Sequence, residues 1–207
     1  MKTLDAIISS KIVAVVRLDD YSKATEVARA LVEGGVTVLE FTLTGRGAID
    51  AVRRTRADLG TAAHIGIGTA LTRQDTEAAI DAGAQFVVTP AVRKEVIGVC
   101  VKRSIPVACG GLTPTELLDA HEAGATLVKL FPASVGGPRY IKDVLAPLPF
   151  LKIIPTGGVS VENAREFISA GAIAVGVGGN LVPAQAVARG EFPEITRNAQ
   201  AYVKAVS

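Results

Sequence analysis

The stretch DAGAQFVVTP, residues 81–90, contains the pattern that decides the fold. It passes from the end of an amphipathic, Ala-rich segment through Gly83 into a short run of aromatic and β-branched residues. A glycine directly after a helical segment is a common helix stop, and a short apolar run bounded by turn residues is typical of a buried strand. The stretch therefore predicts a helix that ends near Gly83 and a strand that follows at once.

The same pattern of helix, glycine and strand recurs at residues 122–125 (Glu-Ala-Gly-Ala) and 169–172 (Ser-Ala-Gly-Ala), with a period of roughly 40 residues. Apolar runs of this kind begin at Ile12, Thr37, His64, Gln85, Ile105, Leu127, Lys152 and Ile173. These eight runs alternate with helical patterns, which predicts an α/β fold of the (β/α)8 TIM-barrel type. A doubly wound open sheet is the rival fold, but no GxGxxG fingerprint opens the first unit.

Several helical segments begin with a capping signature. Thr72 with Asp75, and Ser160 with Asn163, are close variants of the capping box and predict helices that start at those residues. The segments before Ile12 and after Pro183 are expected to form further helices that flank the barrel, one of them N-terminal.

Composition limits the class of protein. The chain has 207 residues, 49% hydrophobic and 20% charged, which suits one domain over residues 1–207 with a sizeable core. The net charge is +2 and the basic residues are dispersed, so neither a nucleic-acid surface nor a membrane surface is indicated. No apolar run approaches the ~20 residues of a membrane span, and we expect a soluble cytoplasmic protein.

The sequence offers no metal site. Cys100 and Cys109 lack the spacing of metal ligands and lie among apolar residues, so we expect buried free thiols. His64 begins a strand, at the end of the barrel opposite the expected active site, and His121 lies in the middle of a helix. Neither has a visible partner, and we predict neither a metal ion nor another cofactor.

Active residues of α/β barrels lie at the carboxyl ends of the strands. Lys129 interrupts the apolar run Thr126–Pro132, where burial would favour the neutral amine that can attack a ketone to form a Schiff base. Glu40 interrupts another strand and could transfer protons to and from a bound substrate. The alternative is that Lys129 and Glu40 form a structural ion pair in the barrel interior.

Three further features belong to the same end of the barrel. Arg17 ends the first strand and would suit a carboxylate clamp, the alternative being an ion pair at the rim. Glycine pairs follow the last two strands, Gly157 with Gly158 and Gly178 with Gly179. Barrels often bind phosphate with these loops and a helix N-terminus, although tight turns alone could also require the glycines.

At this point the residues match a known family. The motifs occur in order along nearly the whole chain, at 13–17 (VAVVR), 34–42 (GGVTVLEFT), 66–69 (GIGT), 86–90 (FVVTP), 113–116 (TPTE), 128–133 (VKLFPA) and 155–159 (PTGGV). The chain resembles the bacterial 2-keto-3-deoxy-6-phosphogluconate aldolases, also called KDPG/KHG aldolases. The VKLFPA and PTGG motifs carry the most specific part of the resemblance.

The resemblance implies a class I aldolase, a lyase without cofactor, whose partners are a small 2-keto acid and pyruvate. It gives Lys129 the role of imine-forming lysine and Glu40 that of general base and acid, acting through a water. The expected reaction is cleavage of 2-keto-3-deoxy-6-phosphogluconate to pyruvate and glyceraldehyde 3-phosphate, and also of 4-hydroxy-2-oxoglutarate to pyruvate and glyoxylate. It also implies a homotrimer.

The resemblance also assigns binding residues. Arg17 and Thr69 would hold the carboxylate of the keto acid, Phe131 and Pro90 would wall the pocket, and Thr156 would touch the aldehyde part. Backbone N–H groups would bind a terminal phosphate, from residues Gly157, Gly158, Gly178 and Gly179.

Two departures from the family pattern bear on the substrate. Some relatives have an arginine at the position of Thr44, and Arg17 would then take over the carboxylate contact. Many relatives have a serine that contacts phosphate at the position of Gly179, so a non-phosphorylated substrate, 2-keto-4-hydroxyglutarate among them, stays open, as does 2-keto-3-deoxy-6-phosphogalactonate. Outside the family, the alternatives are a sugar-phosphate epimerase, an indole-glycerol-phosphate-type enzyme, or a non-catalytic keto-acid-binding protein.

Overall fold

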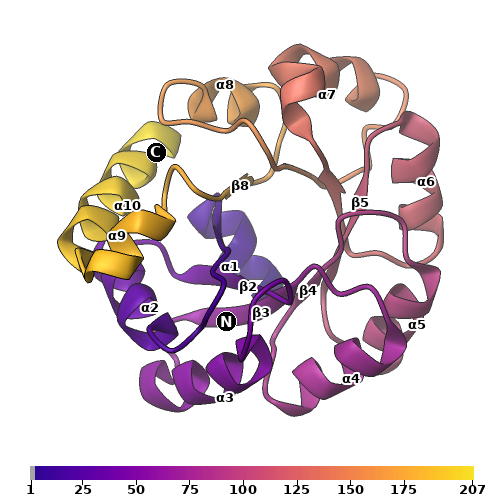
Figure 1. The fold of residues 1–207 in the computed structure, drawn as a ribbon. Coiled ribbons are helices and arrows are strands. Elements are labelled where there is room, and N and C mark those ends of the chain that lie inside the picture. Colours follow the sequence, from indigo (N-terminus) through magenta and orange to yellow (C-terminus); the bar gives the residue numbers. More distant parts are fainter. Residues whose placement is uncertain (1–2) are drawn as a thin grey trace.

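Eight parallel strands lie side by side in the centre of the molecule, in a computed structural model that describes residues 3–207 (Figure 1). Their order in the sheet is β7-β6-β5-β4-β3-β2-β1-β8, so neighbours in sequence are neighbours in space. The strands are β1 (Ile12–Val16), β2 (Val38–Thr42), β3 (His64–Gly68), β4 (Val87–Val88), β5 (Val107–Gly111), β6 (Leu127–Leu130), β7 (Ile153–Pro155) and β8 (Val175–Val177).

The sheet closes on itself between β7 and β8. The amide of Ile173 donates to the carbonyl of Ile153 at 3.0 Å, and Thr156 and Gly176 form an isolated parallel bridge at the other end of the seam. The order of strands and this closure confirm the predicted (β/α)8 barrel.

Helices surround the strands and also cover one end of them (Figure 1). The α-helices are α1 (Thr3–Ser10), α2 (Ala24–Glu33), α3 (Ala48–Leu59), α4 (Arg73–Asp81), α5 (Lys94–Lys102), α6 (Pro114–Glu122), α7 (Gly137–Leu145), α8 (Ala164–Ser169), α9 (Ala184–Arg189) and α10 (Phe192–Val206). A short 3-10 turn, η1 (Ala133–Val135), follows β6. Helix α1 precedes the first strand and α9 and α10 follow the last, as predicted.

Side chains alternate between two cores, because successive residues of a strand point to opposite faces. In β1, Ile12 and Val16 belong to the outer core between the strands and the helices, whereas Val13 belongs to the barrel interior. Ala6 and Ile7 of α1 also belong to the interior cluster. Helix α1 therefore closes the amino end of the barrel and leaves the carboxyl end as the open mouth.

In the stretch 81–90, helix α4 ends just before Gly83, as predicted. Gly83 has a left-handed φ of 105°, its amide bonds to the carbonyl of Ile80 at 2.9 Å, and the amide of Ala84 bonds to that of Ala79 at 3.0 Å. The next amide, that of Gln85, already bonds to Ile65 of β3 at 2.8 Å. A glycine at this point lets the chain leave the helix and enter the sheet within two residues.

Two predicted boundaries differ from the structure. The run from Gln85 forms only a two-residue strand, and beyond it the hydroxyl of Thr89 donates to the carbonyl of Ala91 (2.7 Å) in the loop that follows. The predicted helix start at Ser160 is wrong, since α8 begins at Ala164. The amide of Ser160 donates to the side chain of Asn163 (2.8 Å), which stabilises a turn before the helix. Thr72, in contrast, caps α4 as predicted by accepting from the amide of Asp75 (3.1 Å).

Two other predictions can be compared with the structure. Both cysteines are free and buried, as predicted. None of the helices within residues 3–207 has the length and apolar character that crossing a membrane requires.

Candidate active site

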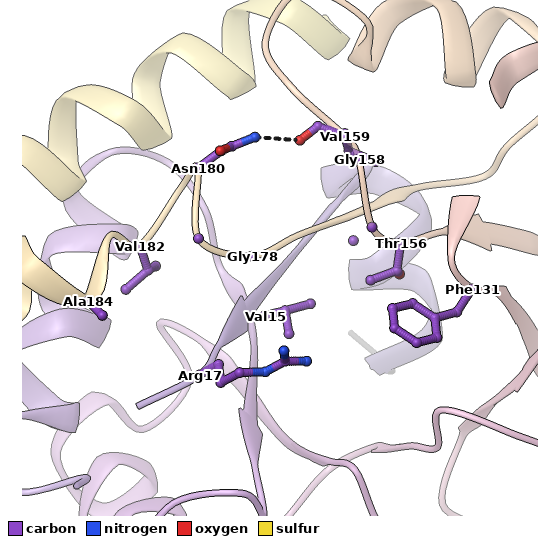
Figure 2. A pocket seen from close by; sticks show the side chains of 13 residues that line it. Val15, Arg17, Phe131, Thr156, Gly158, Val159, Gly178, Asn180, Val182 and Ala184 are labelled. Carbon is purple, nitrogen blue, oxygen red and sulfur yellow. Dashed lines mark hydrogen bonds between the residues drawn. The ribbon is translucent and has the colours of Figure 1, made fainter. Parts of the chain in front are cut away.

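A cavity of about 460 Å³ opens at the mouth of the barrel between β1 and the loops after β6, β7 and β8 (Figure 2). The structure brings together there seven of the residues predicted for the site: Arg17, Phe131, Thr156, Gly157, Gly158, Gly178 and Gly179. They come from distant parts of the sequence, and only the closure of the barrel makes them neighbours.

A much smaller cavity, of about 10 Å³, lies inside the barrel and shares Thr156 and Gly176 with the lining of the larger one. Lys129 and Glu40 both line it. The two charged residues predicted to be catalytic therefore lie beneath the floor of the mouth cavity, and Thr156 stands between the two spaces.

Lys129 projects into the interior from the middle of β6, with 7% of its surface exposed. Its ammonium nitrogen lies 5.2 Å from the centre of the Phe131 ring, within the range of a cation–π contact. No ion pair joins Lys129 to Glu40, and no hydrogen bond from Lys129 to another side chain occurs within residues 3–207. The structural ion pair that was the alternative for these two residues is therefore not formed.

Glu40 is 2% exposed, and its Oε1 has no hydrogen-bond partner in the described part of the chain. Burial raises the pKa of this carboxyl, while the positive charges of Lys129 and Arg17 act in the opposite direction. A carboxyl whose pKa is raised by desolvation is suited to exchange protons with a bound substrate near neutral pH.

Glycine in β3 makes room for this carboxyl. A Cβ atom on Gly68 would overlap Oε1 of Glu40, and a Cβ on Gly66 would overlap the ring of Phe86. The two glycines of the motif GIGT at 66–69 are therefore required because the side chains of Glu40 and Phe86 fill the interior beside them.

Arg17 extends from the end of β1 into the mouth cavity (Figure 2). It is exposed and forms no ion pair and no side-chain hydrogen bond within the described residues, so the rim ion pair that was its alternative is not formed. Thr44, at the position of the family arginine, is exposed and its hydroxyl lies 2.8 Å from that of Thr42.

The two glycine turns face the same cavity. Gly157 and Gly158 have φ of 88° and 80°, values that favour glycine. Their amides, and that of Gly179, donate no backbone hydrogen bond within residues 3–207. Free backbone N–H groups at the lining of a cavity are suited to bind an anion. Helix α8 has only six residues and starts beyond this turn, so the predicted helix N-terminus adds nothing here.

Two predicted residues do not join this group. Thr69 and Pro90 follow β3 and β4 at the mouth of the barrel, but neither lines the two cavities. On this side of the interior, Glu40 and the Phe86 ring occupy the space left by the glycines of β3.

Sequence reasoning missed six residues of the lining: Val15, Val159, Gly176, Asn180, Val182 and Ala184. Five of them are apolar or small, and no local signal marks them. Asn180 is polar and directly follows the second glycine pair, a position that could have singled it out. Its side-chain amide donates to the carbonyl of Val159 at 3.1 Å (Figure 2).

Comparison with known proteins decides the family. The sequence profile described as KDPG and KHG aldolase matches residues 4–198. The chain belongs to the KDPG and KHG aldolase family. A relative within this family, the 2-dehydro-3-deoxy-phosphogluconate aldolase of Treponema pallidum, is 34% identical over 92% of this chain and 90% of its own length. The predictions of the family and of a lyase of the aldolase type are thereby confirmed.

Two solved structures with the same fold illustrate the likeness. The KDPG aldolase of Legionella pneumophila, with pyruvate captured at low pH as a covalent carbinolamine intermediate, has a TM-score of 0.88 and 29% identity, over 95% of this chain and 96% of that one. A cube-shaped protein cage, designed by fusing symmetric oligomeric domains, contains a part with a TM-score of 0.88 and 32% identity, which covers 94% of this chain and 71% of that chain.

No cluster of three or more His, Cys, Asp or Glu side chains that could hold a metal ion is found within residues 3–207. The cations at the site belong to the chain itself, in Lys129 and Arg17.

Proposed function

We propose that this chain is a class I aldolase that cleaves 2-keto-3-deoxy acids to pyruvate and an aldehyde, with Lys129 as the nucleophile. The observation that carries the proposal is the pairing of Lys129 and Glu40 at one small interior cavity without an ion pair between them. A lysine held in a largely apolar interior, next to a carboxyl with a raised pKa, has the two groups that imine chemistry needs.

The reaction begins when the neutral amine of Lys129 attacks the C2 carbonyl and forms a carbinolamine. Loss of water then gives a protonated imine. The C3–C4 bond breaks, its electron pair moves toward the imine nitrogen, and Glu40 accepts the proton of the C4 hydroxyl as the aldehyde leaves. The resulting enamine takes a proton at C3, and hydrolysis releases pyruvate and the free lysine.

The proposed substrate is 2-keto-3-deoxy-6-phosphogluconate, which yields glyceraldehyde 3-phosphate, with 4-hydroxy-2-oxoglutarate as a second substrate. Arg17, with Thr69, would bind the carboxylate beside the imine. Thr156, which lines both cavities, would contact the aldehyde part, and Phe131 and Pro90 would wall the pocket. The glycine turns after β7 and β8 would bind the distal phosphate through their free amides.

A second candidate is a related acid, 2-keto-3-deoxy-6-phosphogalactonate or a non-phosphorylated one. The observation in its favour is Gly179, which offers the distal anion an amide but no hydroxyl and has open space around its Cα. Steady-state cleavage of these acids, each followed by coupled detection of pyruvate, ranks them by kcat/KM.

Assembly and location complete the proposal. We expect a homotrimer in the cytoplasm, and the likeness to a chain used in a cage of symmetric oligomeric domains supports an oligomer. Size-exclusion chromatography with light scattering measures the number of subunits.

The decisive experiment is reduction with sodium borohydride in the presence of pyruvate, followed by intact mass measurement and peptide mapping. One pyruvyl adduct on Lys129 is expected. A folded protein that gains no adduct, or gains it on another lysine, would overturn the proposed mechanism. Incubation with pyruvate but without borohydride is the control for non-covalent binding.

A further inference from the structure

The seam between β7 and β8 is sparsely paired. Most neighbouring strands pair over two to five residues, and β3 and β4 pair at Ile67 with Val87, whereas β7 and β8 are joined beyond the named strands, by the isolated bridge of Thr156 with Gly176 and by the amide of Ile173 on Ile153. This sparsely bonded seam lies directly beneath the two glycine turns. Backbone pairing alone therefore gives the turns little mutual support.

A side chain links the turns above the seam. Asn180 follows the turn after β8, and its Nδ2 donates to the carbonyl of Val159 in the turn after β7 at 3.1 Å (Figure 2). The same carbonyl accepts a second bond from the hydroxyl of Tyr202 in α10, at 3.4 Å. Asn180 thus spans the two turns, whereas Tyr202, whose hydroxyl also lies against the Asn180 side chain, connects this bond to helix α10.

Other hydrogen bonds set the shape of each turn by itself. Asn163 donates to the carbonyl of Gly158 (2.9 Å), and the carbonyl of Gly178 accepts from the amides of Leu181 and Val182 at 2.9 and 3.0 Å. Each of these bonds joins residues of the same turn or of the segment directly after it. They do not connect the two turns, whereas the Asn180 bond does.

We infer that Asn180 is a positioning residue, which holds the two glycine turns at the separation where their free amides bind one distal anion of the substrate. This inference rests on the proposed function. A single part-buried hydrogen bond of this kind contributes only about 0.5–1.5 kcal/mol to the free energy of unfolding. Its effect is expected instead in anion binding, because an anion shared by two turns is bound well only when both are held in place.

The test compares Asn180→Ala with Tyr202→Phe. Both variants remove one donor to the carbonyl of Val159, but only the first cuts the link between the turns. The dissociation constant of inorganic phosphate, measured by titration calorimetry, is expected to rise about tenfold in Asn180→Ala and by less than about twofold in Tyr202→Phe. Equal weakening in both variants, or no weakening in Asn180→Ala, would overturn the inference, as would a wild-type protein that does not bind phosphate.

Kinetics separate positioning from a general structural defect. In Asn180→Ala, KM for 2-keto-3-deoxy-6-phosphogluconate should rise about tenfold while kcat and borohydride trapping of pyruvate stay at wild-type levels. A parallel fall in kcat and in trapping would show damage to the whole site and contradict the positioning role. Absence of trapping in the wild-type protein would instead sink the proposed function, while the phosphate titration would still decide the role of Asn180.

Discussion

The β2–β3 side of the barrel and the β7–β8 seam are built in opposite ways. Strands β2 and β3 stay in register over five residue pairs, from Val38 with His64 to Thr42 with Gly68. Strands β7 and β8 share one isolated bridge, Thr156 with Gly176. The first side holds Glu40 with rigid strand neighbours, and the second presents backbone amides in turns. We infer from this difference that the bond-breaking groups need a fixed interior, whereas the distal anion is bound by turns that side chains must hold together.

Removal of Lys129 tests the interior region most severely. Lys129→Ala is expected to abolish turnover and pyruvate trapping, because among residues 3–207 Lys129 alone brings an amine to the interior cavity. Initial rates and the mass after borohydride reduction measure both effects. Lys152→Ala, at an exposed lysine near the start of β7, is the control and should keep wild-type rates. Substantial turnover by Lys129→Ala would contradict the assignment.

Loss of the carboxyl is the next largest effect. Glu40→Gln is expected to lower kcat by a factor on the order of 10²–10⁴, while pyruvate trapping persists. In the wild-type protein, the rate should fall as the pH falls through the raised pKa of Glu40, because the base must be deprotonated. Rates measured across pH for both proteins check this point. A full rate in Glu40→Gln would show that another group is the base, and Glu122→Gln is a surface control.

Substitutions in the glycine turns above the β7–β8 seam should raise KM and leave kcat unchanged. Gly158→Ala places a Cβ 2.7 Å from that of Ser134 at a φ of 80°, and the displaced turn is expected to raise KM for the phosphorylated substrate about tenfold. Gly47→Ala is a matched control, since Gly47 also has a φ of 80° but an added Cβ meets no atom within 4 Å and lies outside the cavity lining. Equal changes in KM for both variants would show that backbone strain, and not the position of the turn at the cavity, causes the effect.

The smallest effect concerns stability. The folded state raises the pKa of Glu40 above its ordinary value of 4.5, so the folded protein binds the proton more tightly than the unfolded chain. The stability of the wild-type protein should therefore fall as the pH rises from 4.5 through the raised pKa. Glu40→Gln carries no charge at this position, so it should lack this loss and be more stable relative to the wild-type protein at pH 7 than at pH 4.5.

Urea unfolding of wild-type protein and Glu40→Gln at pH 4.5 and pH 7 measures that difference. The stability advantage of Glu40→Gln should be larger at pH 7. An advantage that is equal at the two pH values would mean that charge burial at Glu40 is not its cause.

Local patterns in the sequence were enough to predict most of the fold. The glycine stop at Gly83 and the eight apolar runs depend only on backbone propensity and on the alternation of apolar residues, which act over a few neighbours. Lys129 and Glu40 stood out for the same reason, as single charges inside apolar strands. The helix start predicted at Ser160 was wrong: Asn163 accepts from the amide of Ser160, which is one half of a capping box, but residues 161–163 form a turn and α8 begins at Ala164.

Other properties depend on residues that are distant in the sequence. That Lys129 and Glu40 share a cavity without an ion pair, that Gly68 must lack a side chain beside Glu40, and that Asn180 reaches Val159 all follow from the register between strands. Register and side-chain direction are set when the whole barrel packs and closes, and no local pattern encodes them. The sequence by itself thus determined the barrel and its charged strand residues, while only the tertiary structure decided which groups face each other across the seam.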